Sequence, residues 1–94
     1  MTIVVSPAAR EDLTQAYRQI TQDNPEAADR MLARIAEVIG MLAAGSVEGR
    51  EVRLRDGRQV HTWPVPPYRI YYRESADVFE VVRVYHQARR PIER

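Results

Sequence analysis

The 94-residue sequence contains no cysteine and no lysine, and its only histidines are His61 and His86. The absence of cysteine excludes disulfides and thiolate chemistry, and two imidazoles do not suffice for a dedicated zinc site, so we expect neither a metal nor a cofactor. No apolar run approaches the ~18–20 residues of a membrane helix. Because the N-terminus also lacks a signal-peptide pattern, we expect a cytoplasmic protein.

All fourteen basic side chains are arginine, and ten of them lie between Arg50 and Arg94. Residues 1–48 carry a net charge of −3 and residues 49–94 a net charge of +4. Codon usage in a GC-rich genome explains the missing lysines but not this clustering, and a solvated charged surface is the plain alternative. Because guanidinium groups pair phosphate or carboxylate through two parallel hydrogen bonds, the clustering indicates an anionic partner for the C-terminal half.

Two helix-start signals, Ser6-Pro7 and Asn24-Pro25, each precede a stretch in which apolar residues recur every three or four positions. Ser and Asn suit the N-cap, and Pro suits the first helical position. Gly45 is a natural stop for the second helix. The pattern predicts two helices joined by a short turn into an antiparallel hairpin.

β-Strand patterns flank this hairpin. Residues 2–5 form a short β-branched run, and after the hairpin the apolar period changes to two, with a turn at Asp56-Gly57 and strands over 68–73 and 78–86. We predict a single α+β domain in the order β-α-α-β-β-β, with the helical hairpin packed on one face of a small antiparallel sheet. It spans 1–94, with the strand and hairpin over 1–45, the sheet over 46–88 and an arginine-rich, irregular tail over 89–94.

Arginine and tyrosine alternate along the last two predicted strands. If the helices cover the face that carries Ile70, the alternating residues lie on the open face. An open face of this kind suits anion binding, whereas the plain alternative is a solvated face with cross-strand Arg–Glu pairs. With the two arginines that follow, the candidate binding residues are Arg69, Tyr71, Arg73, Arg83, Tyr85, Arg89 and Arg90.

The two histidines have different expected positions. Strict alternation places His86 on the core face, so it is either a hydrogen-bonded structural residue at the strand end or is turned outward by a bulge; we favour the structural role. His61 has no partner pattern, and we expect it on the surface.

Three segments together resemble known proteins: the opening Val-Val-Ser-Pro-Ala-Ala-Arg-Glu-Asp-Leu, the strand Tyr68–Arg73, and the segment Val82–Arg90. Their order resembles the RelE/ParE superfamily of toxins from type II toxin–antitoxin, or plasmid stabilisation, modules. The resemblance implies a cytoplasmic toxin that inhibits growth and is silenced by a cognate antitoxin. We expect that antitoxin to dock an amphipathic helix or an added strand and to offer carboxylates to the arginines.

One branch of the superfamily, similar to RelE and YoeB, cleaves mRNA on the ribosome. The resemblance implies that Glu51, Arg69 and His86 would be the catalytic residues of such a nuclease. The terminal tyrosine of the YoeB pattern is missing, because Gln87 occupies its place, and the lysines that RelE uses are absent. Gln supplies neither useful acidity nor a stacking ring.

The ParE branch inhibits DNA gyrase without breaking a bond itself. Its ending, Val-x-His-x-x-Arg-Arg, is closer to Val84–Arg90 than the nuclease ending is. The sequence therefore favours a gyrase-binding toxin, with the arginine-rich end and the sheet edge as the binding surface. On this hypothesis, deleting residues 89–94 abolishes toxicity and leaves the fold intact.

Overall fold

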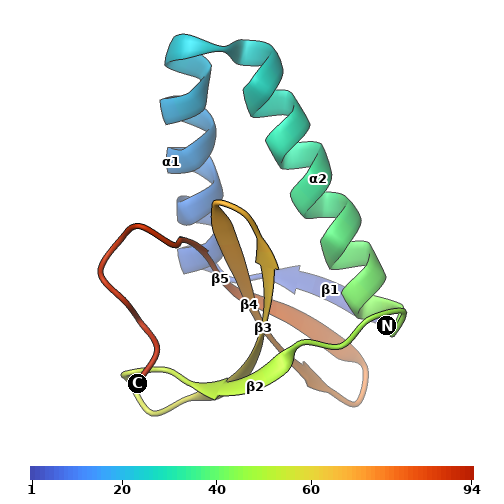
Figure 1. Ribbon diagram of the computed structural model, residues 1–94. Helices are drawn as coiled ribbons and strands as arrows, with labels where there is room; N and C mark the ends of the chain where they lie inside the picture. Colours follow the sequence, from blue (N-terminus) through green and yellow to red (C-terminus); the bar gives the residue numbers. More distant parts are fainter.

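The computed structural model describes all 94 residues and shows a helical hairpin standing over one face of a five-stranded sheet (Figure 1). The strand order is β1-β5-β4-β3-β2. The α+β fold with the hairpin on one face is therefore confirmed. The elements are β1 (Thr2–Val5), α1 (Pro7–Asp23), α2 (Pro25–Ala43), β2 (Arg50–Arg53), β3 (Gln59–Val65), β4 (Tyr68–Ser75) and β5 (Val78–His86).

The predicted caps begin both helices. The Ser6 hydroxyl accepts a hydrogen bond from the Ala9 amide at 3.0 Å and donates one to the Val82 carbonyl at 2.7 Å, so it also ties the start of α1 to β5. The Asn24 side chain accepts from the Ala27 amide at 3.1 Å and separates α1 from α2. Neither helix is both long and apolar enough to cross a lipid bilayer.

The sheet differs from the prediction in two respects. It is mixed, because β1 runs parallel to β5, and four strands follow the helices where the predicted order counts three. β3 runs through Pro64 to Val65. Pro64 is tolerated because β2 pairs with β3 only as far as Thr62, so at Pro64 the strand has a neighbour on one side only.

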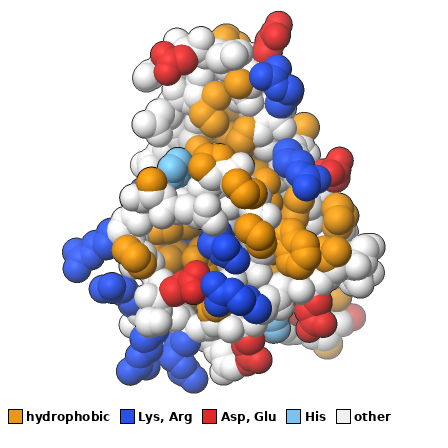
Figure 2. All heavy atoms as spheres, viewed as in Figure 1, with side chains coloured by type: hydrophobic (Ala, Val, Ile, Leu, Met, Phe, Trp, Pro, Cys, Tyr) orange, Lys and Arg blue, Asp and Glu red, His pale blue; other side chains and the backbone are white.

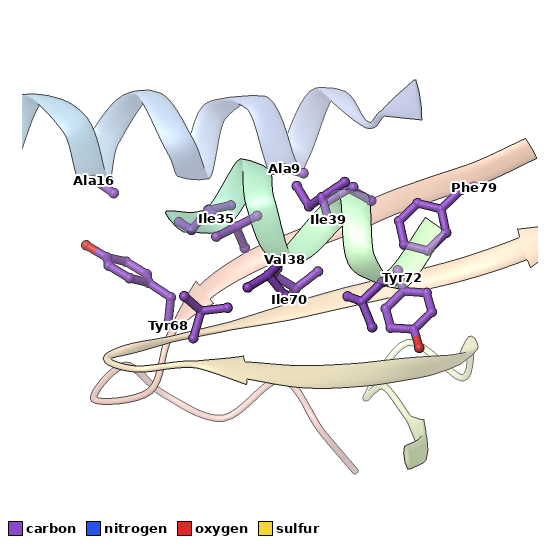
Figure 3. Packing of buried hydrophobic residues seen from close by; sticks show 13 residues of the cluster. Ala9, Ala16, Ile35, Val38, Ile39, Tyr68, Ile70, Tyr72 and Phe79 are labelled. Atoms are coloured by element: carbon purple, nitrogen blue, oxygen red, sulfur yellow. The ribbon is translucent and has the colours of Figure 1, made fainter. Parts of the chain in front are cut away.

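The main core lies between the hairpin and the sheet. It includes Ile35 of α2, Ile70 of β4 and Phe79 of β5, each at most 1% exposed (Figure 3). The pattern of apolar positions in the sequence thus faces the sheet as predicted. The buried members of this main core are Ala9, Ala16, Ile35, Val38, Ile39, Leu42, Val65, Tyr68, Ile70, Tyr72, Phe79, Val81 and Val84.

A second, smaller cluster occupies the other face of the sheet. Its buried members are Leu54, Val60, Tyr71, Val82 and Tyr85. The chain after β5 covers this cluster and ends beside β2, as Figure 1 shows in red. Ile92 packs against the cluster, and the Arg55 amide donates to the Ile92 carbonyl at 2.7 Å. The tail, residues 89–94, is therefore a docked strap across the sheet.

Candidate target-binding surface

The expectation of an open Arg/Tyr face is wrong for its two tyrosines. Tyr71 is 4% exposed and Tyr85 is 9% exposed, because the tail covers the face that the helices leave free. A register shift between β4 and β5 at Tyr71/Tyr72 also interrupts the simple alternation. These side chains hold the tail in place, and only their edges are available to a partner.

Arg83 is also not a free guanidinium. Its Nε and Nη2 donate to the two carboxylate oxygens of Asp12 in α1, at 2.7 and 2.8 Å, and the Val84 amide donates to the same carboxylate at 3.0 Å. The hydrogen bond with Asp12 raises the pKa of Arg83 above its ordinary value. The pair joins α1 to the end of β5, so Arg83 has a structural role that the sequence reasoning did not anticipate.

The other two arginines of the predicted face also have partners. Arg73 pairs with Glu80 across β4 and β5 at 2.6 Å, which is the cross-strand pairing that the plain alternative predicted. The Arg69 Nε donates to the Thr62 hydroxyl at 3.1 Å, but Arg69 forms no salt bridge. Arg69 therefore keeps an uncompensated charge, whereas the charge of Arg73 is largely balanced.

Glu93 anchors the tail. The Tyr71 hydroxyl donates to Glu93 Oε2 at 2.6 Å, and Arg50 lies 3.4 Å from Oε1 of the same carboxylate. Burial, reinforced by the nearby Glu93 carboxylate, raises the pKa of Tyr71 to about 12. The Tyr85 hydroxyl donates to the Arg90 carbonyl at 2.6 Å, which fixes the start of the tail as Glu93 fixes its end.

Arg89 and Arg90 are exposed and form no salt bridge, as predicted for residues that meet a partner. The guanidinium carbon of Arg89 lies 4.8 Å from the centre of the Tyr85 ring, a cation–π arrangement that keeps the side chain at the surface. Beside them is an open hollow of about 190 Å³, lined in part by Arg69 and His86. The binding role of these residues stays a prediction.

The structural role expected for His86 is confirmed. Its Nδ1 accepts a hydrogen bond from the Ala88 amide at 3.0 Å, and its ring meets the Tyr68 ring edge to face at 5.1 Å. It thereby shapes the turn that leads into the tail. His61 is half-buried at the surface, where its ring stacks on Tyr72 at 5.5 Å, so it has an aromatic partner that the sequence did not indicate.

The three residues of the nuclease hypothesis do not form one site. Arg69 and His86 line the same hollow, but Glu51 does not. Glu51 pairs in register with His61, whose ring lies against Tyr72 of the main core, whereas Arg69 bonds to Thr62, the next residue of β3. Because successive side chains of a strand point to opposite faces, Glu51 and Arg69 lie on opposite faces of the sheet.

The sequence reasoning missed Arg53, Arg55 and Arg94. The tail pairs with the end of β2 through the Leu54–Glu93 bridge, and the Arg94 amide donates to the Arg53 carbonyl at 2.8 Å. Figure 2 shows basic side chains at the lower left, where Figure 1 places the tail and the β2–β3 turn. The one available signal was Ile92, an apolar residue in an otherwise polar tail.

Comparison with known proteins places the chain among toxins. Residues 3–91 match the family model described as the ParE toxin of the type II toxin–antitoxin system parDE. Y4kP of Sinorhizobium fredii, a protein named as a candidate toxin, is 39% identical over 77 residues, which cover 82% of this chain and 76% of Y4kP. A solved structure described as the chromosomal ParDE TA system from P. aeruginosa has the same fold, with a TM-score of 0.74, 21% identity, and coverage of 92% of this chain and 95% of that one.

Proposed function

Because the chain belongs to the family of ParE toxins of type II toxin–antitoxin systems, we propose that it stops growth by binding and poisoning DNA gyrase. It acts in the cytoplasm and breaks no bond itself. The observation that supports this choice over mRNA cleavage is the separation of Glu51 from Arg69 by the sheet. Cleavage beside a ribose hydroxyl needs a base and a phosphate-binding cation on the same side of the substrate.

The gyrase-binding surface centres on the end of β5 and the start of the tail. Arg69, Arg89 and Arg90 supply positive charge there and form no salt bridge, and the hydroxyl of Tyr85 fixes the backbone at Arg90. A surface whose backbone is already fixed loses little conformational entropy on binding. Arg83 and Arg73 contribute through the fold, because their charges are already paired.

A cognate antitoxin completes the proposal. The solved relative is described as a ParDE system, that is, a toxin together with its antitoxin. We expect the antitoxin to lay an amphipathic helix or an added strand on this domain and to direct carboxylates at the free arginines. The apolar contacts would set its affinity, and the charges would set its association rate and selectivity.

Inhibition of supercoiling by purified gyrase tests the proposal. We expect the toxin to inhibit the reaction and trap cleaved DNA at micromolar concentration, and Arg89→Ala/Arg90→Ala to weaken inhibition at least tenfold. The matched control is Arg10→Ala/Arg30→Ala, which removes two exposed, unpaired arginines from the helices and should inhibit like the wild type. Deletion of residues 89–94 is a poorer test, because it also uncovers the second cluster.

Two results would contradict the proposal. One is normal supercoiling in the presence of a folded toxin that arrests growth. The other is the appearance of new mRNA ends in the ribosomal A site after induction, with the wild type active and Arg69→Ala inactive. The second result would point to the nuclease branch instead.

A further inference from the structure

Five exposed arginines follow the tail and the end of β2 and form no salt bridge. We call this set the basic rim; it consists of Arg53, Arg55, Arg89, Arg90 and Arg94. The five arginines that do form salt bridges are Arg34, Arg50, Arg58, Arg73 and Arg83. The rim thus gathers more than half of the nine arginines that remain unpaired, on one side of the molecule.

Within the rim, like charges are placed opposite one another. The Leu54–Glu93 bridge sets Arg53 opposite Arg94, and the Arg94 amide donates to the Arg53 carbonyl at 2.8 Å. Side chains opposite one another in an antiparallel pair lie roughly 4.5–5.5 Å apart at Cβ, and like charges there are destabilising. The Arg53 guanidinium donates to the Gly57 carbonyl at 3.1 Å, and neither arginine forms a salt bridge, so an anion bound beside the pair would relieve the repulsion.

The rim is a line rather than a pocket. From Arg89 to Arg94 the tail spans at most about 18 Å, since an extended residue covers up to roughly 3.6 Å. One strand of duplex DNA presents a phosphate about every 3.4 Å along the helix axis, or about five phosphates over that length. Three arginines of the tail and two at the adjoining end of β2 lie within about that length, so the rim extends over roughly five phosphates of one backbone.

The rim offers little apolar surface to a protein partner. The apolar side chains beneath it, Leu54, Tyr85 and Ile92, are already packed into the second cluster, and Leu54 is only 2% exposed. Protein interfaces have an apolar centre in which charged residues are depleted. Contacts made by guanidinium groups alone are instead typical of sequence-independent binding to a phosphate backbone.

We propose that the basic rim binds the phosphate backbone of duplex DNA, independently of sequence. In the setting of the proposed function, on which this inference rests, the duplex is the DNA that gyrase holds. Arg69, Arg89 and Arg90 would contact the enzyme, while Arg53, Arg55 and Arg94, the far part of the rim, contact its DNA. The toxin would then bind the gyrase–DNA complex more tightly than either component alone.

Binding of a short fluorescent DNA duplex to the toxin alone, followed by anisotropy, tests the rim directly. Between about 50 and 200 mM salt, we expect the binding constant to fall with a log–log slope of up to roughly −4.5, or about −0.9 for each phosphate contacted. Arg53→Ala/Arg55→Ala should make the slope shallower by about 2 units for any duplex sequence. The control, Arg10→Ala/Arg30→Ala, makes the same change in net charge on the helices and should keep the wild-type slope.

Several outcomes would overturn the inference. The first is that the duplex does not bind at about 100 μM toxin in low salt. The second is that the rim variant and the control lose DNA affinity equally. The third is that the rim variant loses affinity for the antitoxin but binds DNA like the wild type. Circular dichroism checks that both variants are folded. The supercoiling assay separates the two proposals. Inhibition of gyrase by a toxin that does not bind DNA would rule out only the DNA-binding role of the rim. DNA binding by a toxin that does not inhibit gyrase would rule out the gyrase hypothesis.

Discussion

The two faces of the sheet are closed in different ways. On one face, two helices of 17 and 19 residues cover a core of thirteen buried residues, and the contact is almost entirely apolar. On the other face, a tail of six residues covers five buried residues and is held by polar contacts such as Tyr71–Glu93. The helical side supplies most of the folding stability, and the tail side supplies a fixed surface that is cheaper to open.

Charge follows the same division. The buried carboxylate of Asp12 lies at the helix side and pairs fully with Arg83, whose side chain is 25% exposed. At the tail side, the five arginines of the basic rim are exposed and form no salt bridge. Positive charge without a salt-bridge partner is therefore concentrated on the side of the sheet that opens more easily, as is common for surfaces that serve binding.

The largest expected effect tests this division of stability. Phe79→Ala removes a 0%-exposed ring from the main core and should lower the free energy of unfolding by about 3–5 kcal/mol. Leu54→Ala, at 2% exposure in the second cluster, should cost only about 2–3 kcal/mol, because the tail can settle into the space. Urea unfolding measures both. Equal losses would show that the two faces are equally rigid.

A smaller effect concerns the contact that anchors the tail. Tyr71→Phe should cost about 1–2 kcal/mol at neutral pH, because the Tyr71 hydroxyl donates to a partly exposed carboxylate. The folded-state pKa of Tyr71, about 12, lies above its ordinary value of 10.0. Burial of the hydroxyl and then its bond to Glu93 both favour the protonated form, so this stabilisation is fully present below pH 10 and is lost as the pH rises toward 12.

The difference in unfolding free energy between wild type and Tyr71→Phe, followed from pH 10 to 12, isolates the contribution of the Tyr71 hydroxyl. Urea unfolding at several pH values should show the gap between them closing from pH 10 to 12. Glu93→Gln is the matched variant, since it keeps an acceptor but removes the charge, and its gap to wild type should close over the same range. A gap that stays constant to pH 12 would mean that the fold does not favour the protonated form of Tyr71.

Local signals were sufficient to predict the helical side. Ser6-Pro7 and Asn24-Pro25 are complete start signals, and the bounds observed, Pro7–Asp23 and Pro25–Ala43, follow from them and from Gly45, whose φ is 77°. The mixed sheet was not predictable in the same way. The parallel pairing of β1 with β5 joins residues more than seventy positions apart, and no local pattern encodes such a partner.

The surface was predicted only in part, for a related reason. Arg89 and Arg90 are exposed as expected, because the sequence places them beyond the last strand. Alternation alone put Tyr71 and Arg83 on an open face, since it carries no information about what covers a face from elsewhere in the chain. Asp12 and Glu93, the two carboxylates that hold these side chains, come from α1 and the tail, and their partners are fixed only by the fold.

The smallest expected effect on stability comes from an exposed ion pair, and its comparison with a buried pair shows which arginine pairing stabilises the fold. Arg73 and Glu80 form an ion pair whose side chains are 47% and 27% exposed, so water and salt screen their attraction. Arg73→Ala should therefore lower the free energy of unfolding by no more than about 1 kcal/mol, and less in high salt. Arg83→Ala should cost more, because it leaves the Asp12 carboxylate, 5% exposed, with only the Val84 amide. Urea unfolding at low and high salt measures both variants, and a larger loss for Arg73→Ala would mean that the exposed pair between β4 and β5 contributes more than its accessibility to water allows.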